Sequence, residues 1–167
     1  MRNALLEYYY QFHTQQHYFL CHDILEEAWK AQDQYEKQDF VVGLILFATA
    51  SYHYRRGNFR GALRTYRKAE NIFNQYSDTV MTQFGIDGMA FRQLIKQLIS
   101  DINLEKLFTP IRLPLLDDTI QTLTAQYHDY TVRKDIVSTP DILDHHRNRD
   151  RSSVIRAREV AYQLRHS

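Results

Sequence analysis

The chain has 167 residues, of which 44% are hydrophobic and 25% charged, values typical of a globular protein and not of a disordered or fibrous one. Its formal net charge of +1 argues against nucleic acid as a partner, and its apolar runs are shorter than the roughly 20 residues that span a membrane. Residues 1–12 lack the features of a signal peptide, and the single cysteine, Cys21, excludes an internal disulfide. We therefore expect a cytoplasmic protein without a membrane partner.

Five glycines and three prolines, beside twelve tyrosines and nine phenylalanines, favour long helices, because turn-forming residues are scarce and large rings are abundant. The first predicted helix covers residues 4–12. Polar residues then interrupt the pattern, and Thr14 is a candidate N-cap for the next helix. His13 and His17 lie in this polar stretch, so we interpret them as exposed side chains and not as ligands.

The second predicted helix covers residues 18–32, and the third covers residues 40–56. One face of the second carries residues at i, i+4, i+7 and i+11, namely Tyr18, His22, Leu25 and Trp29. The third is apolar nearly all round, which predicts burial on several sides. Gly57 is a natural stop for it, and Asn58 is a candidate cap for the helix that follows.

The fourth predicted helix, residues 59–73, is apolar inside and basic outside. Residues 55–68 contain no acidic residue, whereas residues 23–39 are mainly acidic. These stretches are either two solvated helix faces, patches through which the protein self-associates, or, for the basic one, a surface that contacts phosphate or, as a weaker alternative, nucleic acid. The basic face consists of Arg60, Arg64, Arg67 and Lys68.

The second half of the chain predicts further helices. Residues 77–88 read as a loose connection, residues 91–102 as a fifth helix, and a helix with Asp117 or Asp118 near its start follows a proline-containing link. Residues 132–137 are a candidate short strand. We therefore expect an all-α bundle of about five to seven helices over residues 1–137, with an antiparallel helix pair at its core, and a polar, basic helical tail over residues 138–167.

The spacing of His22 and Glu26 raises the question of chemistry. Residues four apart on a helix point the same way, with Cβ atoms roughly 6 Å apart, so both side chains can reach one ion. If the second and third helices form an antiparallel pair that turns near Glu36, positions 22 and 53 lie about 21 Å and 25 Å from the turn. His53 can then join the other two, and a divalent metal normally needs three or four protein ligands.

These residues also carry a resemblance. His22, Glu26 and Trp29 fit an HxxxExxW signature, and the chain resembles the bacterial and archaeal family called domain of unknown function 309 over about residues 12–73. Asp23 stands where the family usually has glutamate, Leu20 stands where it usually has an acidic residue, and a glycine usual near position 16 is absent. The resemblance implies a mostly helical structure and a motif suspected of binding metal. A second matching block, residues 43–62, contains Tyr52, His53, Arg55, Arg56, Gly57, Asn58, Gly61 and Ala62.

Three interpretations of the motif stay open. His22 bonded to Glu26 or to a tyrosine hydroxyl would fix the helix pair without metal, while a divalent metal or a metal-free acid–base pair would make the same residues functional. The first hypothesis is therefore a binding or interaction protein with a polar pocket of His22, Glu26 and His53 between two helices. The alternative is a metal-dependent, hydrolase-like enzyme that uses the same three residues. The supporting residues in either case are Tyr18, Trp29, Tyr52, Arg56 and Asn58.

Overall fold

The computed structural model describes residues 1–143, 156, 159–160 and 162–163. Over that part of the chain the regular structure is helical, without a β-strand, which confirms the all-α fold class. The predicted tail helix lies largely outside the described residues. No helix in the described part is long and apolar enough to cross a membrane. The α-helices are α1 (Arg2–Tyr10), α2 (Tyr18–Lys30), α3 (Phe40–Arg55), α4 (Phe59–Phe73), α5 (Asp78–Gln83), α6 (Gly88–Asn103), α7 (Asp117–Gln126) and α8 (Pro140–Leu143), and a π-helical turn, η1 (Gln11–Gln15), follows α1.

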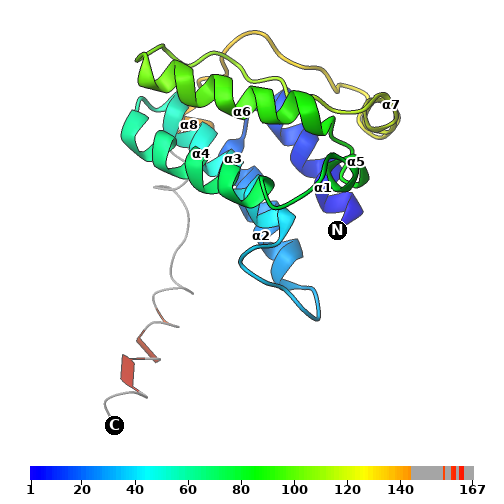
Figure 1. Cartoon of the computed structure of the whole chain (residues 1–167), viewed down its shortest axis with the longest axis vertical. Helices are drawn as coiled ribbons and strands as arrows, with labels where there is room; N and C mark the ends of the chain where they lie inside the picture. Colours follow the sequence, from blue (N-terminus) through cyan, green and yellow to red (C-terminus); the bar gives the residue numbers. More distant parts are fainter. Residues whose placement is uncertain (144–155, 157–158, 161, 164–167) are drawn as a thin grey trace.

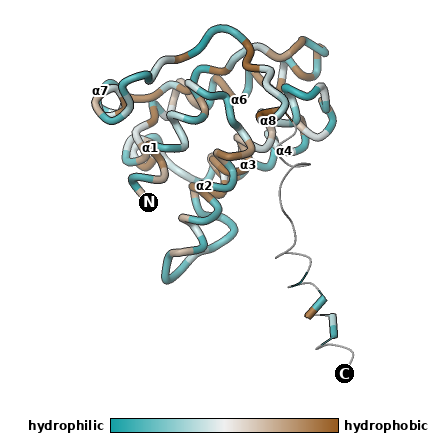
Figure 2. Tube along the Cα trace, turned by 180° about the vertical axis from the view of Figure 1, so that it is seen from behind, coloured by the Kyte–Doolittle hydropathy of each residue, from teal (hydrophilic) through white to brown (hydrophobic). Residues whose placement is uncertain are grey.

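Helix α3 lies at the centre of the fold, packed against α2 on one side and α4 on the other (Figure 1). Its side chains are apolar around most of the helix, so burial on several sides is favourable. A Cβ on Gly43 would come within 2.5 Å of the Phe73 ring, so glycine allows α3 and α4 to approach closely here. Figure 2 shows hydrophobic residues gathered along α3, whereas the turn between α2 and α3 is hydrophilic and exposed.

The helix ends follow from local chemistry, with one difference from expectation. Asn58 caps α4 by accepting a hydrogen bond from the Gly61 N–H at 3.0 Å, and Gly57 ends α3 at φ 76°, both as predicted. The cap of α2 is His17, whose Nδ1 accepts from the Leu20 N–H at 3.2 Å. Thr14 was predicted for that role, but its hydroxyl instead donates to the Thr131 carbonyl at 2.8 Å.

Two further sequence predictions are wrong. The stretch read as a loose connection contains α5, whose N-terminus is capped by the Ser77 hydroxyl. Residues 132–137 form no strand, because side chains from η1 and its C-cap, instead of a neighbouring strand, bind the backbone around them. The Gln16 amide donates to the Asp135 carbonyl at 2.7 Å and accepts from the Val137 N–H at 3.0 Å. Gln16 itself has φ 52°, a left-handed conformation that glycine adopts at lower cost than other residues.

His13 is buried, with 2% of its surface exposed, so its interpretation as an exposed side chain is wrong. Its Nε2 accepts a hydrogen bond from the Leu113 N–H at 2.8 Å, which leaves Nδ1 to donate to the Tyr130 hydroxyl, also at 2.8 Å. The neutral ring thus joins η1 to two segments about 100 residues away. Burial, together with the nearby positive charge of Arg112, lowers the pKa of His13 to about 4.

This lowered pKa predicts a loss of stability in acid. The folded state favours neutral His13, so its contribution is fully present above the ordinary histidine pKa of about 6.5 and is lost as the pH falls through 4. We expect a loss on the order of 3 kcal/mol in the free energy of unfolding from this residue. Urea denaturation at pH 7, 5.5 and 4 measures it, and His13→Gln, which has no titrating group, should show a flatter pH dependence. Parallel pH profiles for the two proteins would contradict the assignment.

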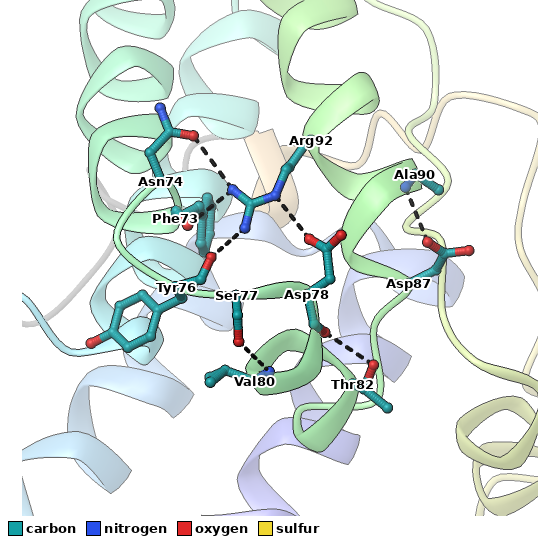
Figure 3. Close-up of polar contacts among 10 residues, drawn as sticks. All are labelled: Phe73, Asn74, Tyr76, Ser77, Asp78, Val80, Thr82, Asp87, Ala90 and Arg92. Atoms are coloured by element: carbon teal, nitrogen blue, oxygen red, sulfur yellow. Dashed lines mark hydrogen bonds and ion pairs between the residues drawn. The ribbon is translucent and has the colours of Figure 1, made fainter.

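Arg92 of α6 binds the C-terminal end of α4 (Figure 3). Its guanidinium donates to the carbonyls of Phe73, at 3.1 Å, and Tyr76, and to the Asn74 side chain at 3.4 Å. Its Nε donates to the Asp78 carboxylate at 3.0 Å, in the first turn of α5. The last carbonyls of a helix have no partner within the helix, and a cation there also favours the helix dipole. One side chain therefore connects α4, α5 and α6.

Replacement of Arg92 by alanine should lower the free energy of unfolding by about 2–3 kcal/mol, since carbonyls at a helix end lose charged donors. Arg92→Lys should be intermediate, because an ammonium cannot reproduce the planar fork. Chemical denaturation measures both. Arg64→Ala is the matched control, since Arg64 is exposed and makes no hydrogen bond or ion pair with the described residues, and a change beyond about 0.5 kcal/mol is not expected there. Wild-type stability of Arg92→Lys would show that charge alone matters.

Candidate functional site between helices α2 and α3

Helix α2 brings three possible metal ligands together at the edge of its buried face. His22 Nδ1 lies 3.1 Å from Asp23 Oδ1, and His22 Nε2 lies 3.8 Å from Glu26 Oε2. One ligand atom from each of the three residues lies within 4.8 Å of the others, and all three side chains are half-buried. Lys30 also binds this group, with Nζ 2.7 Å from Glu26 Oε1. We call His22, Asp23 and Glu26 the α2 triad.

The orientation of α2 explains the partial burial of the triad. The stripe predicted from the sequence is fully buried at Tyr18 and Leu25, which pack in the core together with Cys21. His22 and Trp29 are only half-buried, because the buried face is centred on the Cys21 side of that stripe. The helix thus keeps its apolar residues in the core and places the triad at the boundary with solvent.

Trp29 stabilises the turn between α2 and α3. Its Nε1 donates to Asp39 Oδ2 at 2.9 Å, and the same carboxylate oxygen accepts from the Glu36 N–H at 2.8 Å. The indole also meets the Tyr35 ring edge-on, with 4.9 Å between centroids. The tryptophan of the motif therefore packs and hydrogen-bonds at the opposite end of the helix pair from His53.

A cavity of about 300 Å³ lies beside the triad. It is formed where α2 begins and α3 ends, away from the turn that Trp29 stabilises. Phe19 contacts both sites, with its ring centroid 5.5 Å from that of His22 and 5.2 Å from that of Tyr52. The sequence hypothesis grouped His53 with His22 and Glu26. The structure instead places His53 in the wall of this cavity, and among the described residues it is not part of the metal-ligand group. The cavity is lined by Phe19, Thr49, Tyr52, His53, Arg56 and Asn58.

The polar groups of this cavity are held by one another and by the backbone. Arg56 donates to the Tyr52 hydroxyl at 2.7 Å, with its guanidinium 5.3 Å from the centre of that ring. The Tyr52 hydroxyl donates in turn to the Leu143 carbonyl at 2.8 Å. The Asn58 amide nitrogen lies 3.2 Å from His53 Nδ1, and its oxygen caps α4. Four of these residues were predicted from the sequence as part of the site, whereas Phe19 and Thr49 were not, because their types are ordinary in a helix core.

Arg55 lies on the other side of α3 and is largely buried. Its guanidinium stacks 4.6 Å from the centre of the Tyr18 ring and donates to the carbonyls of Gln16 and, at 3.0 Å, Ile142. Burial lowers the pKa of Arg55 and raises that of Tyr18. No described hydrogen-bond partner reaches the Tyr18 hydroxyl or Arg55 Nε. This cation–ring pair packs the start of α2 against the end of α3. Tyr18 is not among the residues that line the cavity.

The basic face predicted on the fourth helix is present on α4. Its four side chains are exposed, and no hydrogen bond or ion pair within the described part of the chain involves them. They stand at i, i+4, i+7 and i+8, so successive members are separated by about 6, 4.5 and 1.5 Å along the helix axis. The face is formed by Arg60, Arg64, Arg67 and Lys68.

The structure is helical over its described residues and has a cavity with polar lining along the α2–α3 pair, and comparisons with known proteins agree with the sequence resemblance. The family model described as Domain of unknown function (DUF309) matches residues 5–65, which include most of α1, all of α2 and α3, the α2 triad and the residues that line the cavity. An uncharacterized protein of Bacillus subtilis (strain 168), YpuF, is 31% identical over 166 residues, which cover 97% of this chain and 95% of that protein. The chain belongs to the DUF309 family. No solved structure matches it.

Proposed function

We propose that this protein is a binding module whose ligand site is the cavity between α2 and α3. The observation that carries the proposal is the cavity itself, about 300 Å³ in volume, with two aromatic rings and four polar side chains in its wall. Small-molecule sites combine an apolar wall with a few convergent polar groups and begin at about this volume. Polar groups held by their neighbours lose little freedom on binding, which favours affinity.

The proposed cellular setting is the cytoplasm. The one cysteine of the chain, Cys21, is a buried thiol, and a lone thiol suits a reducing compartment. Burial raises the pKa of Cys21 well above its ordinary value, so the thiol packs as a small apolar group.

Filling the cavity tests the proposal. Thr49→Phe adds a ring to the cavity wall while it keeps every other lining residue, and Thr49 otherwise uses its hydroxyl only to donate to the Ile45 carbonyl one turn earlier. Fragments that bind wild-type protein in ligand-observed NMR should lose binding to Thr49→Phe. Thr124→Phe is the matched control, because the Thr124 hydroxyl makes the same bond to the Ile120 carbonyl on α7. Equal binding to all three proteins would contradict a site in this cavity.

A second candidate function is divalent metal binding by the α2 triad. The observation in its favour is that one imidazole nitrogen and two carboxylate oxygens can converge within 4.8 Å. Nitrogen and carboxylate ligands suit Zn²⁺ or Mn²⁺, and three protein ligands leave a position for water, as in metal-dependent hydrolases. In this proposal Asp23 takes the place that the sequence hypothesis gave to His53. Glu26 would have to exchange its ion pair with Lys30 for the metal.

Calorimetric titration of Zn²⁺ and Mn²⁺ into metal-depleted protein distinguishes the two ligand sets. His22→Gln and Asp23→Asn should each weaken binding at least about tenfold, because each removes one of only three protein ligands. His53→Gln should leave the affinity unchanged. The exposed His128 offers a control variant, His128→Gln, for adventitious binding by histidine. A lack of binding to wild-type protein would refute the metal candidate, and an equal loss in His53→Gln would restore the set of His22, Glu26 and His53.

A further inference from the structure

Helix α4 and the end of α2 carry exposed charges of opposite sign. The basic face of α4 makes no hydrogen bond or ion pair with the described residues. We infer that a second copy of this chain binds this face through residues 27–39, the end of α2 and the turn that follows, which we call the acidic turn. These surfaces are separate from the cavity, so the inference does not depend on the proposed function.

The acidic turn has a surplus of negative charge. Glu27, Asp33 and Glu36 are exposed, and their carboxylates make no hydrogen bond or ion pair in the described part of the chain. The cations of this stretch are Lys30 and Lys37, and the Lys30 ammonium is already paired within α2 at 2.7 Å. Several carboxylates are therefore available to a cationic surface.

The fold keeps the two charged surfaces apart within one molecule. Helix α3 lies between α2 and α4 (Figure 1), and the basic face points away from α3 because the opposite side of α4 is buried. The acidic turn projects beyond the packed helices and is hydrophilic (Figure 2). Among the described residues no ion pair joins the two surfaces, so their charges can pair with each other only between molecules.

Tyr35 gives the acidic turn an aromatic anchor. Its side chain is 48% exposed, and its ring meets the Trp29 indole edge-on, with 4.9 Å between centroids, which restrains it. Tyrosine and arginine are enriched among the residues that dominate interface affinity, and a guanidinium is attracted to the face of a tyrosine ring. In the proposed contact Tyr35 packs against arginines of α4 in the second copy, with Asp33 and Glu36 beside their guanidinium groups.

The chemistry of both surfaces favours a second copy over a polyanion. The net charge of the chain is +1, so no global field attracts nucleic acid. The forked guanidinium groups of Arg60, Arg64 and Arg67 match the two oxygens of a carboxylate. Each copy carries both surfaces, so two copies can form the contact twice.

Sedimentation velocity of the full chain measures the association. At low ionic strength the average mass should rise with protein concentration. At high salt it should return to the mass of the monomer, because the screening length falls from about 10 Å at 0.1 M to about 3 Å at 1 M ionic strength. A protein that stays monomeric at low salt up to about 0.1 mM would overturn the inference.

Two charge-reversal variants assign the surfaces. Arg64→Glu with Arg67→Glu makes the α4 face acidic, and Asp33→Lys with Glu36→Lys makes the turn basic. Each double variant should associate at least about tenfold more weakly than wild type, because like charges then meet. An equal mixture of the two should regain association, since each supplies the charge that the other now requires. A mixture no stronger than its components would refute the pairing of these two surfaces.

A matched control separates specific contact from general repulsion. Arg2→Glu with Lys134→Glu changes the net charge by the same amount as the α4 variant, at exposed positions outside both surfaces. It should associate like wild type, and a loss equal to that of the α4 variant would contradict the inference. Tyr35→Ala should weaken association without a change in net charge. Thermal denaturation verifies the fold of each variant, and the exposed positions make large losses of stability unexpected.

A titration with a short DNA duplex at low salt tests the rival partner. The duplex should bind wild type no more tightly than it binds the control with Arg2→Glu and Lys134→Glu. If the duplex binds wild type but not Arg64→Glu with Arg67→Glu, and wild type alone is monomeric, the basic face serves a polyanion and the inference is wrong.

Discussion

The burial of α3 between α2 and α4 is the constraint on which the rest of the structure depends. An apolar helix of 16 residues must be covered on more than one side, and only neighbours along its whole length can do so. Close approach at Gly43 brings α4 against it, and the aromatic contacts of Phe47 with Phe12, Tyr66 and Phe91 extend the same core to η1, α4 and α6. Helix α2 packs against α3 because this contact buries apolar surface of α3. The candidate site lies along that contact.

A second set of interactions connects the two halves of the chain. The π-helical turn after α1 directs His13 and Thr14 toward segments more than 100 residues away, and Gln16 at its end binds the same region of the chain. These buried polar groups are all hydrogen-bonded to one another or to the backbone, as interior polar groups must be to avoid a desolvation cost. The connection extends to α3, because Arg55 at its end donates to the Gln16 carbonyl. The irregular C-terminal segments therefore hold η1 by these side-chain contacts and by the hydrogen bond from the Arg133 N–H to the His13 carbonyl, and not by a regular sheet or helix pair.

The candidate site consists of two chemically different neighbours. The α2 triad groups one imidazole with two carboxylates, while the cavity beside it is lined by two aromatic rings and four polar side chains. Phe19 contacts His22 on one side and Tyr52 on the other.

Local chemistry made much of this fold predictable. The bounds of α3 and α4, the cap at Asn58 and the left-handed stop at Gly57 depend on residues within a few positions, and so does the grouping of His22 with Glu26. The antiparallel direction of α2 and α3 also follows from a short connection between two long helices. These features are determined by the sequence because hydrophobic period and capping act within a helical turn or two.

Tertiary packing decided the rest. The residue His13 is a buried hydrogen-bonding group only because Leu113 and Tyr130 come to it from the far end of the chain. Likewise, the rotation of α2 about its own axis and its height relative to α3 place Phe19 against Tyr52, and His53 consequently joins the cavity and not the triad. Periodicity defines which residues share a face but not which neighbour that face meets, since the contacts that set rotation and height join residues far apart in the sequence.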